Sequence, residues 1–259
     1  MTRLTTRPLV LCSNDDGIDA PHLSALAERI EAFADVVVVA PERQRSAASH
    51  AITLHKPLRL TELGPRRFAL SGTPVDCVYL GILKLCDRLP AVVVSGINDG
   101  FNLGSDVFYS GTVAAAVEGA LRGAAGIAFS LAPGAEDPAR AVGFAAAVVR
   151  AAVDEPSPPG TVLNVNMPRT PSDGYQWTVL GRRLYSDDVS ERRDPRGRPY
   201  YWVGGGPTGH DDVEGTDCVA VARGWNSITP MHLDLTDRGR IDQPPWALEG
   251  FHVMVGSPP

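Results

Sequence analysis

Asn14, Asp15 and Asp16 are the first residues along the sequence whose types and spacing could carry chemistry. The apolar run 9–12 and Ser13 precede them, and Gly17 follows them. Two adjacent carboxylates repel each other unless a cation lies between them or water solvates both. The stretch is therefore typical either of a divalent-metal site or of a polar turn, because Asn, Asp and Gly are also ordinary turn residues.

Two more polar loops follow apolar, β-branched runs. Residues 43–49 come after the run 35–40, and residues 98–106 come after the run 91–96. In an open parallel sheet, ligands bind outside the carboxyl ends of the strands. We therefore expect the three loops to converge there and to offer carboxylate, hydroxyl and amide oxygens. Such an oxygen-only donor set suits Mg²⁺, Mn²⁺ or Ca²⁺ better than zinc or copper.

Ser110, Gly111 and Thr112 stand at the start of the alanine-rich run 113–121, which predicts a helix. The free backbone N–H groups of a helix start can bind phosphate, although most hydroxyl caps bind nothing. Next to a metal, this helix start indicates phosphate-ester chemistry. A metal ion can neutralise phosphate oxygens and lower the pKa of a bound water molecule.

Alternation of strands and helices is the dominant pattern of the first two thirds of the chain. Run 9–12, an amphipathic helix at 23–33 and run 35–40 form a βαβ unit, which predicts a parallel sheet. Further strands are expected at 58–60, 67–70, 91–96, 127–131 and 161–168, and further helices at 75–86 and 138–153. The predicted fold class is α/β, with a Rossmann-like, mostly parallel sheet.

The last third of the sequence has a different pattern. We predict one domain over residues 1–259, with a core at about 8–170 and a β-rich arm with the C-terminal segment at about 171–259. Short strands are expected at 176–180, 200–203, 217–222 and 227–235, with a charged stretch at 187–198. The aromatic run 200–203 indicates either an oligomer contact or a lobe that covers the core.

Composition excludes several classes of protein. The 259 residues carry a formal net charge of −6, which argues against a nucleic-acid polymer as partner. No apolar run has the length of a membrane span, no signal peptide is visible, and the four cysteines form no C-x-x-C pair. We therefore predict a cytoplasmic protein. Residues 204–209 fit G-x-G-x-x-G, but no helical pattern follows, so a dinucleotide site is not expected.

The sequence resembles the SurE survival-protein family, whose members are metal-dependent 5′/3′-nucleotidases. The resemblance extends from about residue 9 to residue 236, with the motifs in the family's order. The matching motifs are residues 13–17, 40–46, 95–98, 102–104, 109–115 and 227–230. One departure is His22, which stands where the family commonly has glycine.

The resemblance implies a set of site residues. One Mg²⁺ or Mn²⁺ ion per subunit is expected on Asp15, Asp16, Ser46 and Asn98. Phosphate is expected to lie against Asn14, Asn102, Ser110, Gly111 and Thr112. The two aspartates are the candidate catalytic residues. The resemblance also implies a protruding β segment that is exchanged between subunits of a homodimer or homotetramer.

The expected activity is hydrolysis of nucleoside 5′-monophosphates, and of the 3′-monophosphates and short polyphosphate that family members also cleave. We expect water to attack phosphorus in line. A phospho-aspartate formed on Asp15 is the rival mechanism. Two other functions remain open, namely a metal-dependent nucleotide-sugar transferase and a nucleotide-binding module without catalytic activity.

Overall fold

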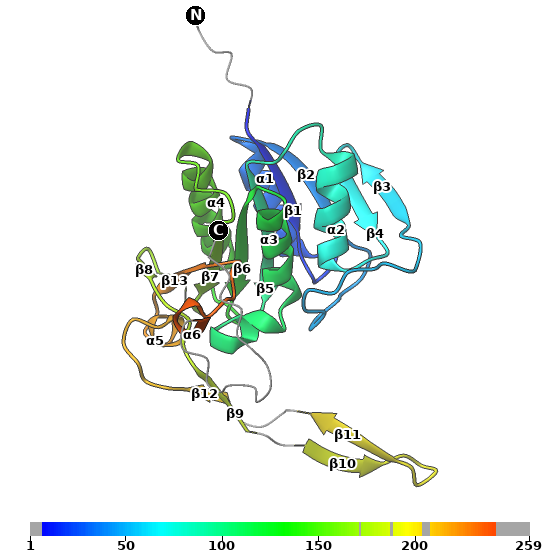
Figure 1. Ribbon diagram of the computed structural model, residues 1–259, viewed down its shortest axis with the longest axis vertical. Coiled ribbons are helices and arrows are strands. Elements are labelled where there is room, and N and C mark those ends of the chain that lie inside the picture. The colour runs from blue at the N-terminus through cyan, green and yellow to red at the C-terminus, as the bar shows by residue number, and fades with distance from the viewer. Residues whose placement is uncertain (1–6, 171, 187–188, 204–207, 242–259) are drawn as a thin grey trace, which may run out of the picture.

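A mixed β-sheet forms the centre of the molecule. The computed structural model describes residues 7–170, 172–186, 189–203 and 208–241. Nine strands in these ranges form one sheet, with helices on both of its faces (Figure 1). Across the sheet the strands are β3 (Leu60–Gly64), β4 (Arg67–Leu70), β2 (Asp35–Pro41), β1 (Leu9–Ser13), β5 (Val92–Asp99), β6 (Ala125–Leu131), β7 (Val162–Met167), β13 (Asn226–Met231) and β8 (Tyr175–Trp177).

The sheet is parallel from β4 to β7, and this confirms the predicted α/β fold class with a mostly parallel sheet. On either side of this part, β3 pairs antiparallel with β4 and β13 pairs antiparallel with β7, and the edge strand β8 is parallel to β13. The chain leaves β1 toward β2 on one side and later enters β5 on the other side. The carboxyl ends of β1 and β5 therefore flank a topological switch point, where open α/β sheets bind their ligands.

Two helices cover each face of the sheet. The helices are α1 (Pro21–Glu31), α2 (Pro74–Leu80), α3 (Gly111–Leu121), α4 (Pro138–Asp154), α5 (Asp217–Ala222) and α6 (Arg238–Ile241). Buried residues of α1 and α4 belong to one apolar cluster, whereas those of α2 and α3 pack on the opposite face. Thr73 begins α2 with a reciprocal cap, because its hydroxyl accepts from the Asp76 N–H and the Asp76 carboxylate accepts from the Thr73 N–H.

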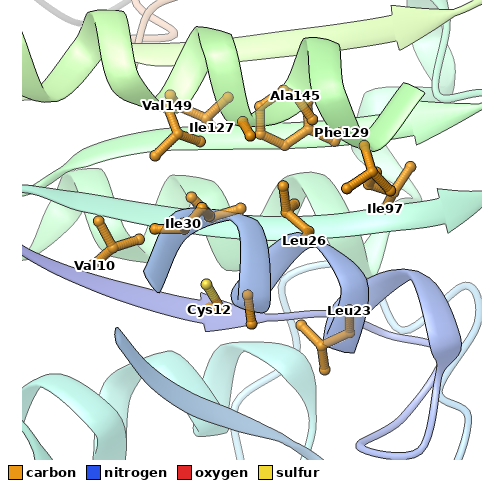
Figure 2. Packing of buried hydrophobic residues seen from close by; sticks show 14 of the residues in the cluster. Val10, Cys12, Leu23, Leu26, Ile30, Ile97, Ile127, Phe129, Ala145 and Val149 are labelled. Atoms are coloured by element: carbon orange, nitrogen blue, oxygen red, sulfur yellow. The ribbon is translucent and has the colours of Figure 1, made fainter. Parts of the chain in front are cut away.

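The larger apolar cluster shows why the strands were recognisable in the sequence. Leu23, Leu26 and Ile30 of α1 lie against the side chains of β1 and its neighbours, as Figure 2 shows. Phe129 of β6 and Val149 of α4 continue the same cluster. Strands that are covered on both faces need apolar residues at every position, and this accounts for their uninterrupted apolar runs.

Helix α3 packs unusually close to the sheet. A Cβ atom on Gly126, at the start of β6, would lie 2.0 Å from the carbonyl oxygen of Ala116 in α3. Any side chain at this position would therefore push the helix away from the strand. The absence of a side chain fixes the distance between α3 and β6 by contact between their main chains.

One strand predicted in the last third of the chain is a helix in the structure. Residues 217–222 form helix α5 and not a strand, so this prediction was wrong. Thr216 caps the helix by accepting from the N–H of Val219. A short apolar run fits a buried strand and a buried helix equally well, and here the cap decides.

The segment assigned to the arm is divided in the structure. Its strands β8 and β13 join the main sheet, whereas four others form two small antiparallel sheets. These are β9 (Arg183–Tyr185) with β12 (Thr208–His210), and β10 (Val189–Arg193) with β11 (Pro199–Val203). In Figure 1 both small sheets project away from the main sheet.

Several predicted features differ in their bounds or lie outside the described residues. Helix α2 ends at Leu80, and a π-helical turn at Gly81–Leu85 completes the predicted helix. Residues 187–188 of the charged stretch, 204–207 of the glycine-rich run and the tail from 242 lie outside the described residues. None of the helices in the described ranges is long and apolar enough to cross a membrane.

Candidate functional site

Asp15 and Asp16 lie just beyond β1, at the switch point of the sheet. Asp15 is buried and Asp16 is half-buried. The hydroxyl of Thr112, in the first turn of α3, donates to Oδ1 of Asp15 at 2.5 Å. The backbone carbonyl of Asp15 accepts from the N–H of Arg45 at 2.7 Å. Asp15 therefore joins the strand end to both α3 and the loop that follows β2.

The local electrostatics favour a cation beside the acidic pair. Burial raises the pKa of Asp15, and the charge of Asp16 raises it further, while the Thr112 hydroxyl lowers it. Burial also raises the pKa of Asp16, and the carboxylate of Asp99 adds to this increase. A bound cation would relieve the repulsion among these carboxylates and hold them ionised.

Ser46 and Asn98 lie on the same cavity as the acidic pair. This cavity has a volume of about 260 Å³, and Asp15 and Asp16 contribute to its walls. The amide nitrogen of Asn98 donates to the carbonyl of Gly100 at 2.8 Å, which leaves the amide oxygen for a ligand. The structure thus brings together all four residues that the sequence predicted as metal ligands.

The donor chemistry of this cavity fits a hard divalent cation. Its predicted ligands are two carboxylates, one hydroxyl and one amide oxygen, which Mg²⁺ and Mn²⁺ accept. Within the described residues, no group of three or more His, Cys, Asp or Glu side chains forms a metal cluster. The site is therefore built from two acidic residues completed by neutral oxygens.

The loop that carries Ser46 is fastened to α3 and to the turn before it. Ser49 donates through its hydroxyl to the carbonyl of Phe108 at 2.6 Å. His50 lies 3.1 Å from the buried carboxylate of Glu118 in α3. These contacts hold the loop against α3 and the turn that precedes it.

The start of α3 is the segment on which an anion site was predicted. Ser110 caps the helix, since its hydroxyl accepts from the N–H of Val113 at 3.0 Å. A Cβ atom on Gly111 would lie 3.0 Å from Cβ of Asp15, so glycine allows the helix start to sit against the acidic loop. Thr112 is occupied by its bond to Asp15. The backbone N–H groups of the first turn are the natural donors to an anion.

Two of the predicted phosphate ligands make other contacts. The side chain of Asn14 is buried and bonds to Gly17 twice, accepting at 3.1 Å and donating at 2.9 Å. Asn14 therefore shapes the acidic loop and does not line the cavity. Asn102 does line the cavity, but its amide nitrogen donates to Ser130 at 2.8 Å. This nitrogen carries a second N–H, which can donate to an anion.

Several residues on the cavity carried no site prediction. They are Gln44, Ala47, Asp99, Phe101, Asp106, Tyr109 and Tyr185. Asp99 ends β5 and Asp106 lies in the loop that follows, and both belong to the polar stretch 98–106, which its composition already marked in the sequence. Tyr185 comes from β9, and no motif in the sequence connects it with the cavity.

A second, larger cavity lies between α3 and the end of β13. It has a volume of about 720 Å³ and is lined mainly by apolar side chains of both elements. None of the four predicted metal ligands lines it. The smaller, polar cavity at the switch point is therefore the candidate site.

Comparisons with known proteins agree on one family. The family model of survival protein SurE matches residues 10–187. The 5′-nucleotidase SurE of Myxococcus xanthus is 50% identical over 255 residues, which cover 94% of this chain and 95% of that protein. The 5′-nucleotidase SurE of Geobacter sulfurreducens is 47% identical over 255 residues, which cover 96% of this chain and 97% of that protein. A crystal structure of the SurE protein from Aquifex aeolicus matches with a TM-score of 0.79 at 38% identity, covering 91% of this chain and 97% of that one. This chain therefore belongs to the SurE survival-protein family.

Proposed function

We propose that this protein is a divalent-metal-dependent phosphomonoesterase that hydrolyses nucleoside 5′-monophosphates. The observation that carries the proposal is the meeting of four oxygen ligands with the start of α3 on one cavity. The names of the relatives from Myxococcus xanthus and Geobacter sulfurreducens, both 5′-nucleotidases, support the same reaction.

Each of the four predicted metal ligands has a role in this proposal. Asp15, Asp16, Ser46 and Asn98 would hold one Mg²⁺ or Mn²⁺ ion. The ion would neutralise phosphate oxygens and lower the pKa of a water molecule. Asp15 and Asp16 are the candidate catalytic groups, and Thr112 keeps Asp15 oriented.

The phosphoryl group would bind at the start of α3. Ser110 and Asn102 line this end of the cavity, and the Ser110 hydroxyl and the second N–H of the Asn102 amide would donate to phosphoryl oxygens beside the helix start. Donors at a helix start stabilise the charge that grows on phosphoryl oxygens during attack by water. Asn14 contributes indirectly, because it fixes the loop that carries the aspartates.

A phosphate-release assay tests this function directly. AMP should release phosphate with Mg²⁺ or Mn²⁺ and not with EDTA, and no sugar acceptor should be needed. Asp15→Asn should lose at least about 100-fold of the activity, which is the scale of losing a group that stabilises the transition state. Asp19→Asn, an exposed carboxylate on the same loop, is the matched control and should keep full activity.

The outcomes separate the alternatives. Full activity in EDTA or in Asp15→Asn would refute the metal site. Turnover only with a sugar acceptor would identify a transferase, and binding of AMP without turnover would identify a binding module. Parallel assays with 3′-AMP and tripolyphosphate extend the test to the other substrates that the family resemblance implies.

We also propose that the projecting sheets mediate self-association into a dimer or tetramer. Tyr200, Tyr201, Trp202 and Val203 of β11 are all exposed in the chain by itself. Contiguous exposed aromatic side chains mark interaction surfaces. Light scattering on Trp202→Ser should show a smaller assembly than the wild type, and an unchanged mass would contradict the proposal.

A further inference from the structure

The candidate cavity has a second wall that the phosphatase chemistry does not use. Phe101, Tyr109 and Tyr185 line it together with the metal-site residues. Tyr109 is 69% exposed and Tyr185 is 50% exposed, so both rings are accessible. A phosphate group needs positive charge or N–H donors, and the faces of these rings provide neither. The rings therefore face a part of the substrate other than its phosphate.

Tyr185 is held at this wall by its own hydrogen bond. Its hydroxyl donates to Oδ1 of Asp106, which also lines the cavity. Arg183, two residues earlier on β9, lies 3.3 Å from Oδ2 of the same carboxylate. Burial and the bond to Asp106 both raise the pKa of Tyr185, so the phenol stays protonated and keeps donating. The arginine offsets the negative charge of Asp106 beside the cavity.

A second, independent contact holds the base of β9 in place. The carboxylate of Asp217 in α5 is completely buried. It accepts from the N–H of Gly104 at 2.9 Å and from the N–H of Gly181 at 2.7 Å. Gly104 begins the 3₁₀-helix that contains Asp106, and Gly181 lies two residues before β9. Asp217 therefore clamps the two segments whose side chains meet at Tyr185.

We propose that Tyr185 and Tyr109 bind the flat base of the nucleotide and thereby select nucleoside monophosphates over phosphate esters without a base. This proposal rests on the function proposed above. An aromatic ring stacks on the face of any base, and such contacts depend little on base identity. The cavity should therefore accept purine and pyrimidine nucleotides alike, with metal and phosphate bound at its polar wall.

The test compares two substrates that share the phosphate and the sugar. Tyr185→Ala should lower kcat/KM for AMP about tenfold, which corresponds to roughly 1.4 kcal/mol at 25 °C. The kcat/KM of this variant for ribose 5-phosphate should stay within about twofold of the wild-type value. Tyr185→Phe keeps the ring and should retain most of the preference for AMP. Tyr175→Ala removes a tyrosine of similar exposure on β8 and should change kcat/KM for neither substrate.

Other results would overturn the assignment. An equal loss for both substrates in Tyr185→Ala would show that the residue only orients Asp106. Unchanged kcat/KM values for both substrates would show that the ring does not touch the base.

Calorimetric titration with adenosine keeps this proposal separate from the reaction, because adenosine has no phosphate to hydrolyse. Weaker binding to Tyr185→Ala would support the ring contact even if the wild type released no phosphate from any ester. Equal binding to both proteins would refute it.

Discussion

The hydrogen bond from Thr112 to Asp15 offers the sharpest test of the site. Thr112→Val removes the hydroxyl that donates to Asp15 at 2.5 Å and replaces it with a methyl group. Thr112 is fully buried and Asp15 is 5% exposed, so water has little access to replace the bond. The packing volume hardly changes, and the loss is therefore mainly one bond to a charged group.

The size of the effect follows from this kind of bond. A hydrogen bond to an ionised group contributes about 1.5–3 kcal/mol. It favours the ionised form of Asp15, so its loss should raise the pKa of Asp15. Because the cation binds the carboxylate, metal affinity should fall about 10- to 100-fold near neutral pH. The acid limb of the activity profile should move to higher pH.

Metal titration of AMP hydrolysis, together with calorimetric binding of Mn²⁺, measures this change. Thr112→Ser keeps the hydroxyl and should bind metal nearly as well as the wild type. Thr53→Val is the matched control, because the Thr53 hydroxyl donates to Asp76 at 2.6 Å outside the cavity. That variant should lose stability with its metal affinity unchanged. The reasoning fails if Thr112→Val binds Mn²⁺ as tightly as the wild type, or if Thr53→Val weakens Mn²⁺ binding as much as Thr112→Val does.

Three further predictions concern other parts of the site. Burial raises the pKa of Asp16, so in EDTA the wild type should lose stability relative to Asp16→Asn as the pH rises from about 4 to about 7. Urea unfolding measures the two free energies of unfolding, and a difference between them that does not change with pH would contradict the prediction. Gly111→Ala places a Cβ atom 3.0 Å from Cβ of Asp15 and should reduce kcat at least about tenfold. Gly143→Ala in α4, where a Cβ atom meets no other atom within 4 Å, should keep the wild-type kcat, and equal kcat values for the two variants would show that Gly111 is dispensable. Asp217→Asn keeps only one acceptor oxygen for the two N–H groups of the clamp and should lower the free energy of unfolding by about 1–3 kcal/mol. An unchanged midpoint of urea denaturation would refute this prediction.

The positions of the candidate metal ligands, though not their role, follow in part from topology. Asp15, Ser46 and Asn98 are far apart in sequence, but each stands just after an apolar run or at its end. A parallel sheet brings such positions to one edge, and the structure places all three on one cavity. The family resemblance selected Ser46 and Asn98 among the other polar residues of these loops, which composition alone does not do.

The aromatic wall and helix α5 were beyond the same reasoning. Tyr185 reaches the cavity through the pairing of β9 with β12 and the Asp217 clamp, and neither contact has a periodic signature in the sequence. The run 217–222 is short and apolar, so only the cap at Thr216 distinguishes its helix from a strand. Asn14 had the right type for a phosphate ligand, but its local bonds to Gly17 occupy the side chain.

The main-chain contact between Gly126 and Ala116 has a consequence for how enzymes of this architecture can diversify. The contact fixes the depth of α3, and with it the floor on which an anion would rest. Larger or smaller side chains in the core cannot adjust the distance between α3 and β6, because no side chain sets it. New substrate preferences should therefore arise by changes in the loops and in β9, while the phosphate end of the cavity keeps its dimensions across natural variation.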